Sequence, residues 1–298
     1  MEHNLWSIVL AAGKGRRLSP LTGGVPKQFW RPAGASSLLD ETLSRLSPLC
    51  PSSRTVIVVD RGHRRYVSAR SSYKNRGQVV FQPSDRGTAA GVLLGLLPVL
   101  VADPDATILL TPSDHGIEHE TIFRRGILEA VGHAQSVGGV VLLGVAPTTP
   151  RDDYGWISVG PVARPDGIRP VEAFVEKPHA AKARWLLMSG AVWNTMVMVA
   201  QVKDLVALFR MHLPNMTATF LQAVAMPASV RREYLAALYP TLPALNFSRD
   251  VLAPARGLLT YTWPSSMGWS DLGTPERLTE WRRTTTPAVA NAGVEASV

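Results

Sequence analysis

Two aspartates far apart in the sequence stand where they could hold a metal ion. Asp114 lies in Pro-Ser-Asp-His at 112–115, directly after an apolar run, and Asp271 lies in Trp-Ser-Asp-Leu-Gly at 269–273. Two carboxylates together with phosphate oxygens suit Mg²⁺, a hard ion that prefers octahedral oxygen coordination. From the residues alone, each aspartate could equally be a helix cap or a turn residue. The neighbouring His115 is expected to support the site rather than to act as a base.

A glycine-containing loop follows the first apolar run of the chain. Gly13 and Gly15 have no Cβ atom, so backbone N–H groups of this loop could approach a phosphate closely. Leu18 stands where the dinucleotide-binding fingerprint needs its third glycine, and the Gly-Lys-Ser/Thr of the P-loop is missing as well. The loop by itself is therefore weak support for a phosphate site, and a tight structural turn explains it equally well.

Basic residues after this loop strengthen the case for a phosphate site. Arg16 and Arg17 follow Gly15 directly, and Lys27 lies in Pro-Lys-Gln-Phe at 26–29. If a reaction releases a phosphate or pyrophosphate group, the charge of that group must be neutralised as it departs. A guanidinium can bind phosphate oxygens through two parallel hydrogen bonds, and a lysine ammonium supplies a mobile point charge.

An acid and a base stand together at the end of a later apolar run. Glu176 and Lys177 belong to Phe-Val-Glu-Lys-Pro at 174–178, in which Pro178 ends the extended segment. A glutamate could accept hydrogen bonds from sugar hydroxyls, and a lysine could neutralise a sugar phosphate. The spacing alone favours the simpler interpretation, a surface ion pair at the end of a strand.

The elements that would position these residues alternate between strands and helices. Buried strands are predicted at 5–11, 55–59, 79–82, 107–110 and 140–145, and helices at 91–101 and 121–134. This alternation predicts an α/β fold with a Rossmann-like, doubly wound, mixed but mainly parallel sheet. Ligands of such sheets bind beyond the carboxyl ends of the strands, which is where Asp114 stands.

The pattern changes after Pro147. Strands are predicted at 156–159, 171–175, 193–199 and 259–263, and a helix-rich stretch at 202–238. No linker separates two independent domains, so we expect one domain at 1–283, in which residues 148–283 form a lid-like subdomain on the same sheet. The stretch 284–298, rich in Thr and Ala, is predicted to be a flexible tail.

Composition narrows the class of protein. The 298 residues are 46% hydrophobic and carry a net charge of +8, which attracts nucleic acid or phosphorylated metabolites. The densest basic region, at 61–76, is predicted to be a solvated surface helix with few aromatic residues for stacking on bases, so nucleic acid is not an expected partner. The single cysteine, Cys50, fits a reducing cytoplasm. No targeting segment is visible and no apolar stretch reaches the roughly 18 residues that cross a membrane, so a soluble cytoplasmic protein is expected.

Several of these motifs together resemble the sugar nucleotidyltransferases, most closely the mannose-1-phosphate guanylyltransferases. The resemblance rests on the loop at 10–18 followed by Pro-Lys-Gln-Phe, and on the Pro-Ser-Asp-His, Phe-Val-Glu-Lys-Pro and Trp-Ser-Asp-Leu-Gly motifs. Tyr-Gly-Trp-Ile at 154–157 and Trp-Asn-Thr-Met at 193–196 are similar to the family's sugar-binding segments, and residues 82–90 to its base-reading loop. The similarity extends from about residue 8 to about residue 278.

The resemblance implies a role for each matched residue. It assigns Asp114 and Asp271 to Mg²⁺ and Arg17 and Lys27 to the triphosphate, and it makes these four and Lys177 the catalytic residues. Other matched positions bind the nucleotide: Ala11, Gly13, Gly15, Gln82, Gly87 and Thr88. The positions that bind the sugar phosphate are Gly155, Glu176, Lys177 and Asn194. On this basis residues 1–147 are the nucleotide-binding half and residues 148–283 the sugar-binding half, although Thr88 could instead be an ordinary helix cap.

The implied reaction is transfer of GMP from GTP to mannose 1-phosphate, by one direct displacement that releases pyrophosphate. A homodimer is also implied. The sequence departs from the family pattern at five positions, which leaves the base and the sugar open: Arg16, Gly87, Met196, Ser248 and Ala253. Thymidylyl or uridylyl transfer to glucose 1-phosphate is the alternative within the class. A non-catalytic regulatory paralogue that binds a nucleotide sugar is the alternative outside it.

Overall fold

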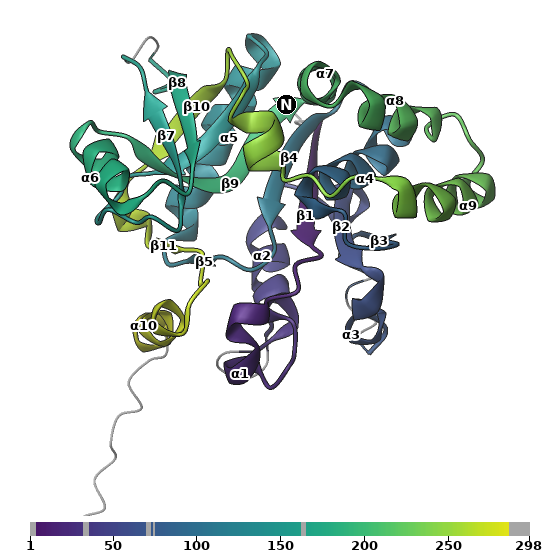
Figure 1. Ribbon diagram of the computed structural model, residues 1–298, viewed down its shortest axis with the longest axis horizontal. Helices are drawn as coiled ribbons and strands as arrows, with labels where there is room; N and C mark the ends of the chain where they lie inside the picture. Colours follow the sequence, from purple (N-terminus) through teal and green to yellow (C-terminus); the bar gives the residue numbers. More distant parts are fainter. Residues whose placement is uncertain (1–3, 32–35, 70–72, 74, 162–164, 286–298) are drawn as a thin grey trace, which may run out of the picture.

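One nine-stranded sheet organises the chain (Figure 1). The computed structural model describes residues 4–31, 36–69, 73, 75–161 and 165–285. Within the sheet the strands lie in the order β3-β2-β1-β4-β9-β6-β10-β8-β7, so that β3 lies at one end, whereas β7 pairs with both β8 and β9. The α/β class predicted from the sequence is confirmed.

The first part of the sheet is parallel. β1 (Leu5–Ala11) pairs in parallel with β2 (Thr55–Asp60) and with β4 (Thr107–Pro112), and β2 pairs in parallel with β3 (Gln78–Gln82). The strands β1, β2 and β4 are buried along almost their whole length, as expected for parallel strands covered on both faces. Their carboxyl ends meet at one edge of the sheet, where the glycine-containing loop and Asp114 follow.

The expectation of a mainly parallel sheet is wrong for the second part. β9 (Val192–Gln201) runs antiparallel to β4 and β6 (Val140–Val145), between which it lies. β7 (Gly155–Val159) and β8 (Arg169–Glu176) also pair antiparallel, whereas β10 (Leu259–Trp263) is parallel to β6 and antiparallel to β8. A buried apolar run indicates a strand but carries no information on its direction, which depends on the connection that precedes it.

Helices cover both faces of the sheet, so the doubly wound arrangement is present. On one face, a core that includes Ile8 and Val58 packs against α4 (Gly87–Ala102), α7 (Val202–His212), α8 (Pro214–Gln222) and α9 (Ala228–Leu238). On the other face, a core that includes Val9 and Val59 packs against α2 (Leu38–Leu46) and α5 (Glu120–Ser136). Figure 1 shows α8 and α9 beyond the end of the sheet formed by β3, and α6 (Ala180–Met188) beside β7 and β8.

The remaining helices and turns lie outside these two layers or connect their elements. The helices among them are α1 (Ser19–Thr22), α3 (Arg64–Ser68), α10 (Pro275–Thr285) and the single turns η1 (Arg16–Leu18), η2 (Lys27–Phe29), η3 (Ser52–Arg54), η4 (Arg61–His63), η6 (Tyr239–Thr241), η7 (Ser248–Leu252) and η8 (Ser265–Met267). The basic region at 61–76 forms a helix shorter than predicted, with residues 70–72 and 74 outside the described part of the chain. α10 extends two residues into the expected tail, of which residues 286–298 lie outside the described part. Among the described residues, no helix combines the length and the apolar character that crossing a bilayer requires.

Cys50 should be chemically inert in the folded protein. Its side chain is buried, and burial raises the pKa of the thiol to about 12, so that almost no thiolate is present near neutral pH. We expect negligible reaction with a disulfide reagent such as DTNB under native conditions and complete reaction in guanidinium chloride. Rapid labelling of the native protein would show that the packing around Cys50 is looser than described.

Candidate active site

A second, two-stranded sheet brings the two aspartates together. β5 (Gly116–Ile117) follows Asp114 and pairs antiparallel with β11 (Trp269–Ser270), which directly precedes Asp271. Two further backbone hydrogen bonds extend this pairing, from Glu118 N to the Gly268 carbonyl (3.2 Å) and from His119 N to the Met267 carbonyl (3.1 Å). The small sheet therefore fixes two distant segments side by side at the carboxyl end of β4.

Lys27 contacts both segments. Its Nζ lies 3.1 Å from Oδ2 of Asp114 and also donates a hydrogen bond to the backbone carbonyl of Asp271. The lysine side chain is 8% exposed, so its charge is largely withdrawn from water and depends on these oxygens. Gly15 packs against it: a Cβ atom there would lie 3.0 Å from the backbone nitrogen of Lys27. The glycine-containing loop, Lys27 and both aspartates thus form one cluster.

The carboxylate of Asp271 is held by three donors. Its Oδ1 accepts hydrogen bonds from the Tyr154 hydroxyl (3.1 Å), from the Gly273 backbone N–H (2.9 Å) and from Arg277. Burial alone would raise the pKa of Asp271, but the charge and hydrogen bond of Arg277 and the charge of Lys27 act against it, and the pKa stays below its usual value. Asp271 is therefore an oriented anion at neutral pH.

Arg277 links this carboxylate to a second acid. Its guanidinium pairs with Asp271 and with Asp153, donates to the Tyr154 hydroxyl (2.9 Å), and lies over the Tyr154 ring at 4.7 Å. The side chain is 7% exposed. Sequence reasoning missed Arg277, because an arginine in the first turns of a polar helix looks like any solvated residue. Its spacing of six from Asp271 matches none of the motifs that the sequence offers.

The two aspartates fit a divalent cation by the oxygens they leave available. Among the described residues, Oδ1 of Asp114 and Oδ2 of Asp271 accept no hydrogen bond, and the two side chains are 28% and 25% exposed. No group of three or more metal-ligating side chains occurs in the described ranges. A hard ion held here would take its remaining ligands from water and from phosphate, which is typical of Mg²⁺.

His115 is placed as a supporting residue. Its Nδ1 accepts a hydrogen bond from the indole N–H of Trp269 (3.2 Å), and the two rings meet edge to face at 5.4 Å. Desolvation by the surrounding protein lowers the pKa of His115 to about 4, so the ring is neutral with its proton on Nε2. A neutral imidazole whose acceptor nitrogen is already occupied has no site left to take a proton from a substrate.

The glycine-containing loop after β1 is held in place by contacts with two other segments. The Gln28 amide donates to the carbonyls of Ala11 (2.7 Å) and Gly13 (3.0 Å). Lys14 forms an ion pair with Asp85 (3.2 Å), which joins this loop to the segment at 82–90. Arg17 is exposed, and no contact links it to the cluster around Lys27 among the described residues. Ala11 and Gly13 are thus held against Gln28 and Gly15 lies against Lys27, whereas Arg17 lies at the surface.

The segment at 82–90 packs against the loop before η7. The Thr88 hydroxyl accepts from Phe247 N (2.8 Å), and Ala89 N donates to the Leu245 carbonyl (3.1 Å). Thr88 is therefore not an ordinary cap: Arg86 occupies the cap position of α4 and makes no side-chain capping bond. Gln82 is buried at the end of β3, close to Gly91 in α4.

Gly87→Ala should destabilise the protein. Gly87 has φ +78°, and a Cβ atom there would lie 2.1 Å from the Leu245 carbonyl oxygen. The left-handed backbone alone would cost about 1–3 kcal/mol for a residue with a side chain, and the collision adds to it. We expect a clear fall in the midpoint of thermal unfolding. The matched control is Gly132→Ala in α5, where no atom lies within 4 Å and alanine favours the helix, so a fall of equal size would contradict this explanation.

The expected sugar-phosphate residues gather on β7, β8 and β9. A Cβ atom at Gly155 would lie 2.9 Å from Oε2 of Glu176 and 3.3 Å from Cβ of Asn194, so these three residues are in contact. Lys177 Nζ lies 3.8 Å from Oε1 of Glu176, and its backbone N–H donates to the Tyr154 carbonyl (3.2 Å). Because Tyr154 also contacts Asp271, this group adjoins the aspartate expected to bind the metal.

Backbone strain is concentrated in the same region. Among the described residues, the non-glycine residues with positive φ are Lys177 (+46°), Met196 (+59°) and Leu272 (+49°). Each adjoins a residue expected to bind substrate or metal, or is one itself. Met196 lies within a bulge in β9, between Asn194 and Val197; Asn194 Oδ1 accepts its backbone N–H, and its sulfur lies 3.0 Å from the Ser248 hydroxyl. Residues held in sparsely populated conformations are typical of functional sites.

Comparisons with known proteins point to one family. Residues 6–287 match the family model described as nucleotidyl transferase. A mannose-1-phosphate guanylyltransferase of Sinorhizobium fredii is 30% identical over 89% of this chain and 52% of its own length, and mannose-1-phosphate guanylyltransferase 2 of Escherichia coli O157:H7 is 28% identical over 91% and 58%. The chain spans about half the length of the curated relatives it matches.

A solved structure supports the same relationship. The crystal structure of a mannose-1-phosphate geranyltransferase from Thermus thermophilus, so named, is 31% identical and superimposes with a TM-score of 0.80, covering 91% of this chain and 76% of that one.

Proposed function

This chain belongs to the nucleotidyl transferase family, and on that premise we propose that it transfers GMP from GTP to mannose 1-phosphate and releases pyrophosphate. One observation carries the proposal: Lys27 contacts both Asp114 and Asp271, so a single basic residue and two acids share one place at the carboxyl end of β4. A cation and a triphosphate could be held there together.

Each residue would act by position and charge. Lys27 and Arg17 would neutralise the triphosphate, and the backbone of Ala11, Gly13 and Gly15 would approach its oxygens. Glu176, Asn194 and the Gly155 backbone would orient the sugar, while Lys177 neutralises its phosphate. Asp114 and Asp271 would hold Mg²⁺, which when bound offsets the charge of the phosphates. The sugar-phosphate oxygen is already ionised, so no base and no covalent intermediate is needed.

We also propose that the two halves of the chain bind different substrates. Residues 1–147 would bind the nucleotide, and residues 148–283 would bind the sugar and act as the lid-like part. The observation in favour is that Gly155, Glu176 and Asn194 lie on β7, β8 and β9 and Lys177 directly follows β8, whereas Asp114 and the glycine-containing loop follow β4 and β1. The cytoplasmic location and the homodimer stay predictions.

The test is a substrate matrix. Purified protein is incubated with mannose 1-phosphate or glucose 1-phosphate, with each common nucleoside triphosphate and Mg²⁺, and pyrophosphate is measured. We expect the fastest release with GTP and mannose 1-phosphate. Faster release with TTP or UTP and glucose 1-phosphate would assign the alternative transfer. Tight binding of GDP-mannose without any release would favour a regulatory role.

A further inference from the structure

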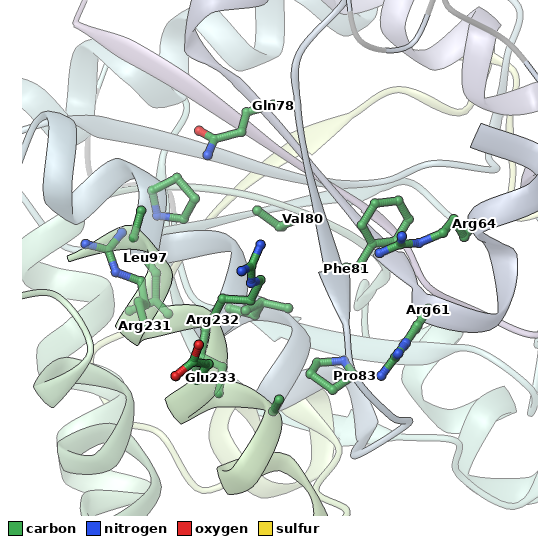
Figure 2. Close-up of a pocket in the computed structure, with 15 residues that line it drawn as sticks. Arg61, Arg64, Gln78, Val80, Phe81, Pro83, Leu97, Arg231, Arg232 and Glu233 are labelled. Carbon is green, nitrogen blue, oxygen red and sulfur yellow. The ribbon is translucent and has the colours of Figure 1, made fainter. Parts of the chain in front are cut away.

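The free edge of the main sheet carries a hollow that the proposed reaction does not use. β3 is the terminal strand, and a cavity of about 580 Å³ lies across it, between α3 on one side and α4 and α9 on the other. Figure 2 shows Arg61, Arg64 and Phe81 on one side of this hollow and Leu97, Arg231 and Arg232 on the other. None of these residues belongs to the cluster around Lys27.

The floor of the hollow is apolar. Leu94, Leu97 and Leu235 are buried in it, and Val80 of β3 and Pro98 of α4 are half-buried. A volume of this size is typical of cavities that bind a ligand. Apolar side chains that cover the floor would remove its surface from water, which would stabilise the complex.

The rim is basic, and most of its charge is available. Among the described residues, the side chains of Arg61 and Arg232 have no ion pair or hydrogen bond, and Arg64 stacks over the Phe81 ring at 4.9 Å. Arg231 differs, because it donates to the carbonyls of Ala223, Val224 and Met226. With Glu233 as the acid on this rim, the hollow has a positive balance that attracts an acidic partner.

The backbone around the hollow offers both N–H groups and carbonyl groups. A ligand that binds both kinds needs hydrogen-bond acceptors as well as donors. An edge strand presents N–H and C=O groups that no neighbouring strand binds. Pro98 lies inside α4 and has no N–H, so the carbonyl of Leu94 lacks its usual helical donor, and both residues line the hollow. A phosphate or another small anion supplies acceptors alone, whereas a polypeptide backbone supplies both kinds of group.

We propose that the β3 edge binds an extended, acidic polypeptide segment of another protein, which adds to the sheet as a further strand. Side chains alternate along a strand, so one set would fill the apolar floor at Val80 and Leu97, and the other would lie toward Arg61 and Arg64. A second copy of this chain is a poor occupant, because pairing two β3 edges would bring two basic rims together.

The test uses a fluorescein-labelled peptide with the core Val-Glu-Val-Asp-Val-Glu, measured by fluorescence anisotropy against the full chain. Two peptide controls have the same composition of apolar residues: one carries N-methyl groups at alternate positions and cannot pair as a strand, and one has lysine in place of each acid. The protein variant is Arg61→Glu with Arg64→Glu and Arg232→Glu, and its matched control is Arg210→Glu, an exposed arginine on α7 outside the hollow.

We expect the parent peptide to bind, and the N-methylated peptide, the lysine peptide and the triple variant each to weaken binding about tenfold or more. Bound peptide should also slow amide hydrogen exchange in β3. Arg210→Glu should leave binding unchanged, and the triple variant should keep its pyrophosphate release, so this result is independent of the proposed reaction. Equal binding of the N-methylated peptide, displacement by inorganic phosphate or GDP, or no binding at all would overturn the proposal; in the last case the arginines merely protect the edge.

Discussion

Asp114→Asn should lower the turnover number on the order of a hundredfold or more at limiting Mg²⁺. The substitution keeps the shape of the side chain but removes one of the two charges that would hold the cation, and it leaves Lys27 without its ionic partner. Pyrophosphate release measured across a Mg²⁺ titration is the appropriate readout, because a lost ligand should raise the Mg²⁺ concentration needed for half-maximal rate.

The control for this prediction lies at the other end of the same strand. Asp105 is exposed and precedes β4, so Asp105→Asn removes an equal charge without touching the cluster. It should leave both the rate and its Mg²⁺ dependence unchanged. A near-normal rate for Asp114→Asn at low Mg²⁺, with a folded protein, would refute the assignment of Asp114 to the metal.

Arg277→Met should affect both stability and activity. It removes a buried cation that pairs with Asp271 and Asp153, and it leaves these two acids beside the Tyr154 ring without their shared partner. We expect a loss of about 2–3 kcal/mol in the free energy of unfolding. Since Asp271 would lose part of its orientation, we also expect turnover to fall about 10- to 100-fold, the range seen when a residue that supports a metal ligand is removed.

Two measurements separate these effects. Arg277→Lys keeps the charge but not the branched geometry, so it should recover most of the stability and less of the activity. The Mg²⁺ concentration for half-maximal rate should rise in the methionine variant, which a merely destabilised protein would not show when assayed below its unfolding transition. If that concentration stays at its wild-type value, Arg277 supports the fold and does not position Asp271.

Much of the fold could be predicted because buried strands appear in the sequence as short apolar runs. The apolar runs at 5–11, 55–59, 107–110 and 140–145 each became a strand, and the helices at 91–101 and 121–134 lie within α4 and α5. The direction of a strand, in contrast, could not be predicted from its own residues. β9 is as apolar as a parallel strand because it is equally buried, and its antiparallel course follows from the reversal of the chain between β7 and β8.

The site was predictable where residues form contiguous motifs. Asp114, Asp271, Glu176 and Lys177 each lie in a short pattern, and the structure brings the two aspartates together through β5 and β11. Arg277 and Asp153 were missed because their importance depends on a tertiary contact between a helix and a loop. The positive φ of Met196 could not be predicted either, because nothing about a methionine in the sequence indicates a strained backbone.

The departure at Gly87 has a physical explanation. Gly87 is one of the five departures from the family pattern, and glycine is the residue that most readily adopts positive φ. The Leu245 carbonyl lies so close that here even a Cβ atom is excluded. The packing of this loop therefore requires glycine at position 87, and the change there does not by itself point to a lost activity.

The place of β9 in the sheet has a consequence for biosynthesis. A nascent chain that ends at residue 147 already contains β4 and β6, but the strand that belongs between them extends to Gln201. Until the ribosome has delivered that segment, two apolar strands lack their shared neighbour and offer open edges to other chains. The centre of the sheet can therefore fold only after the chain has been synthesised as far as Gln201. Before that point the incomplete chain exposes apolar strands of the kind that chaperones bind.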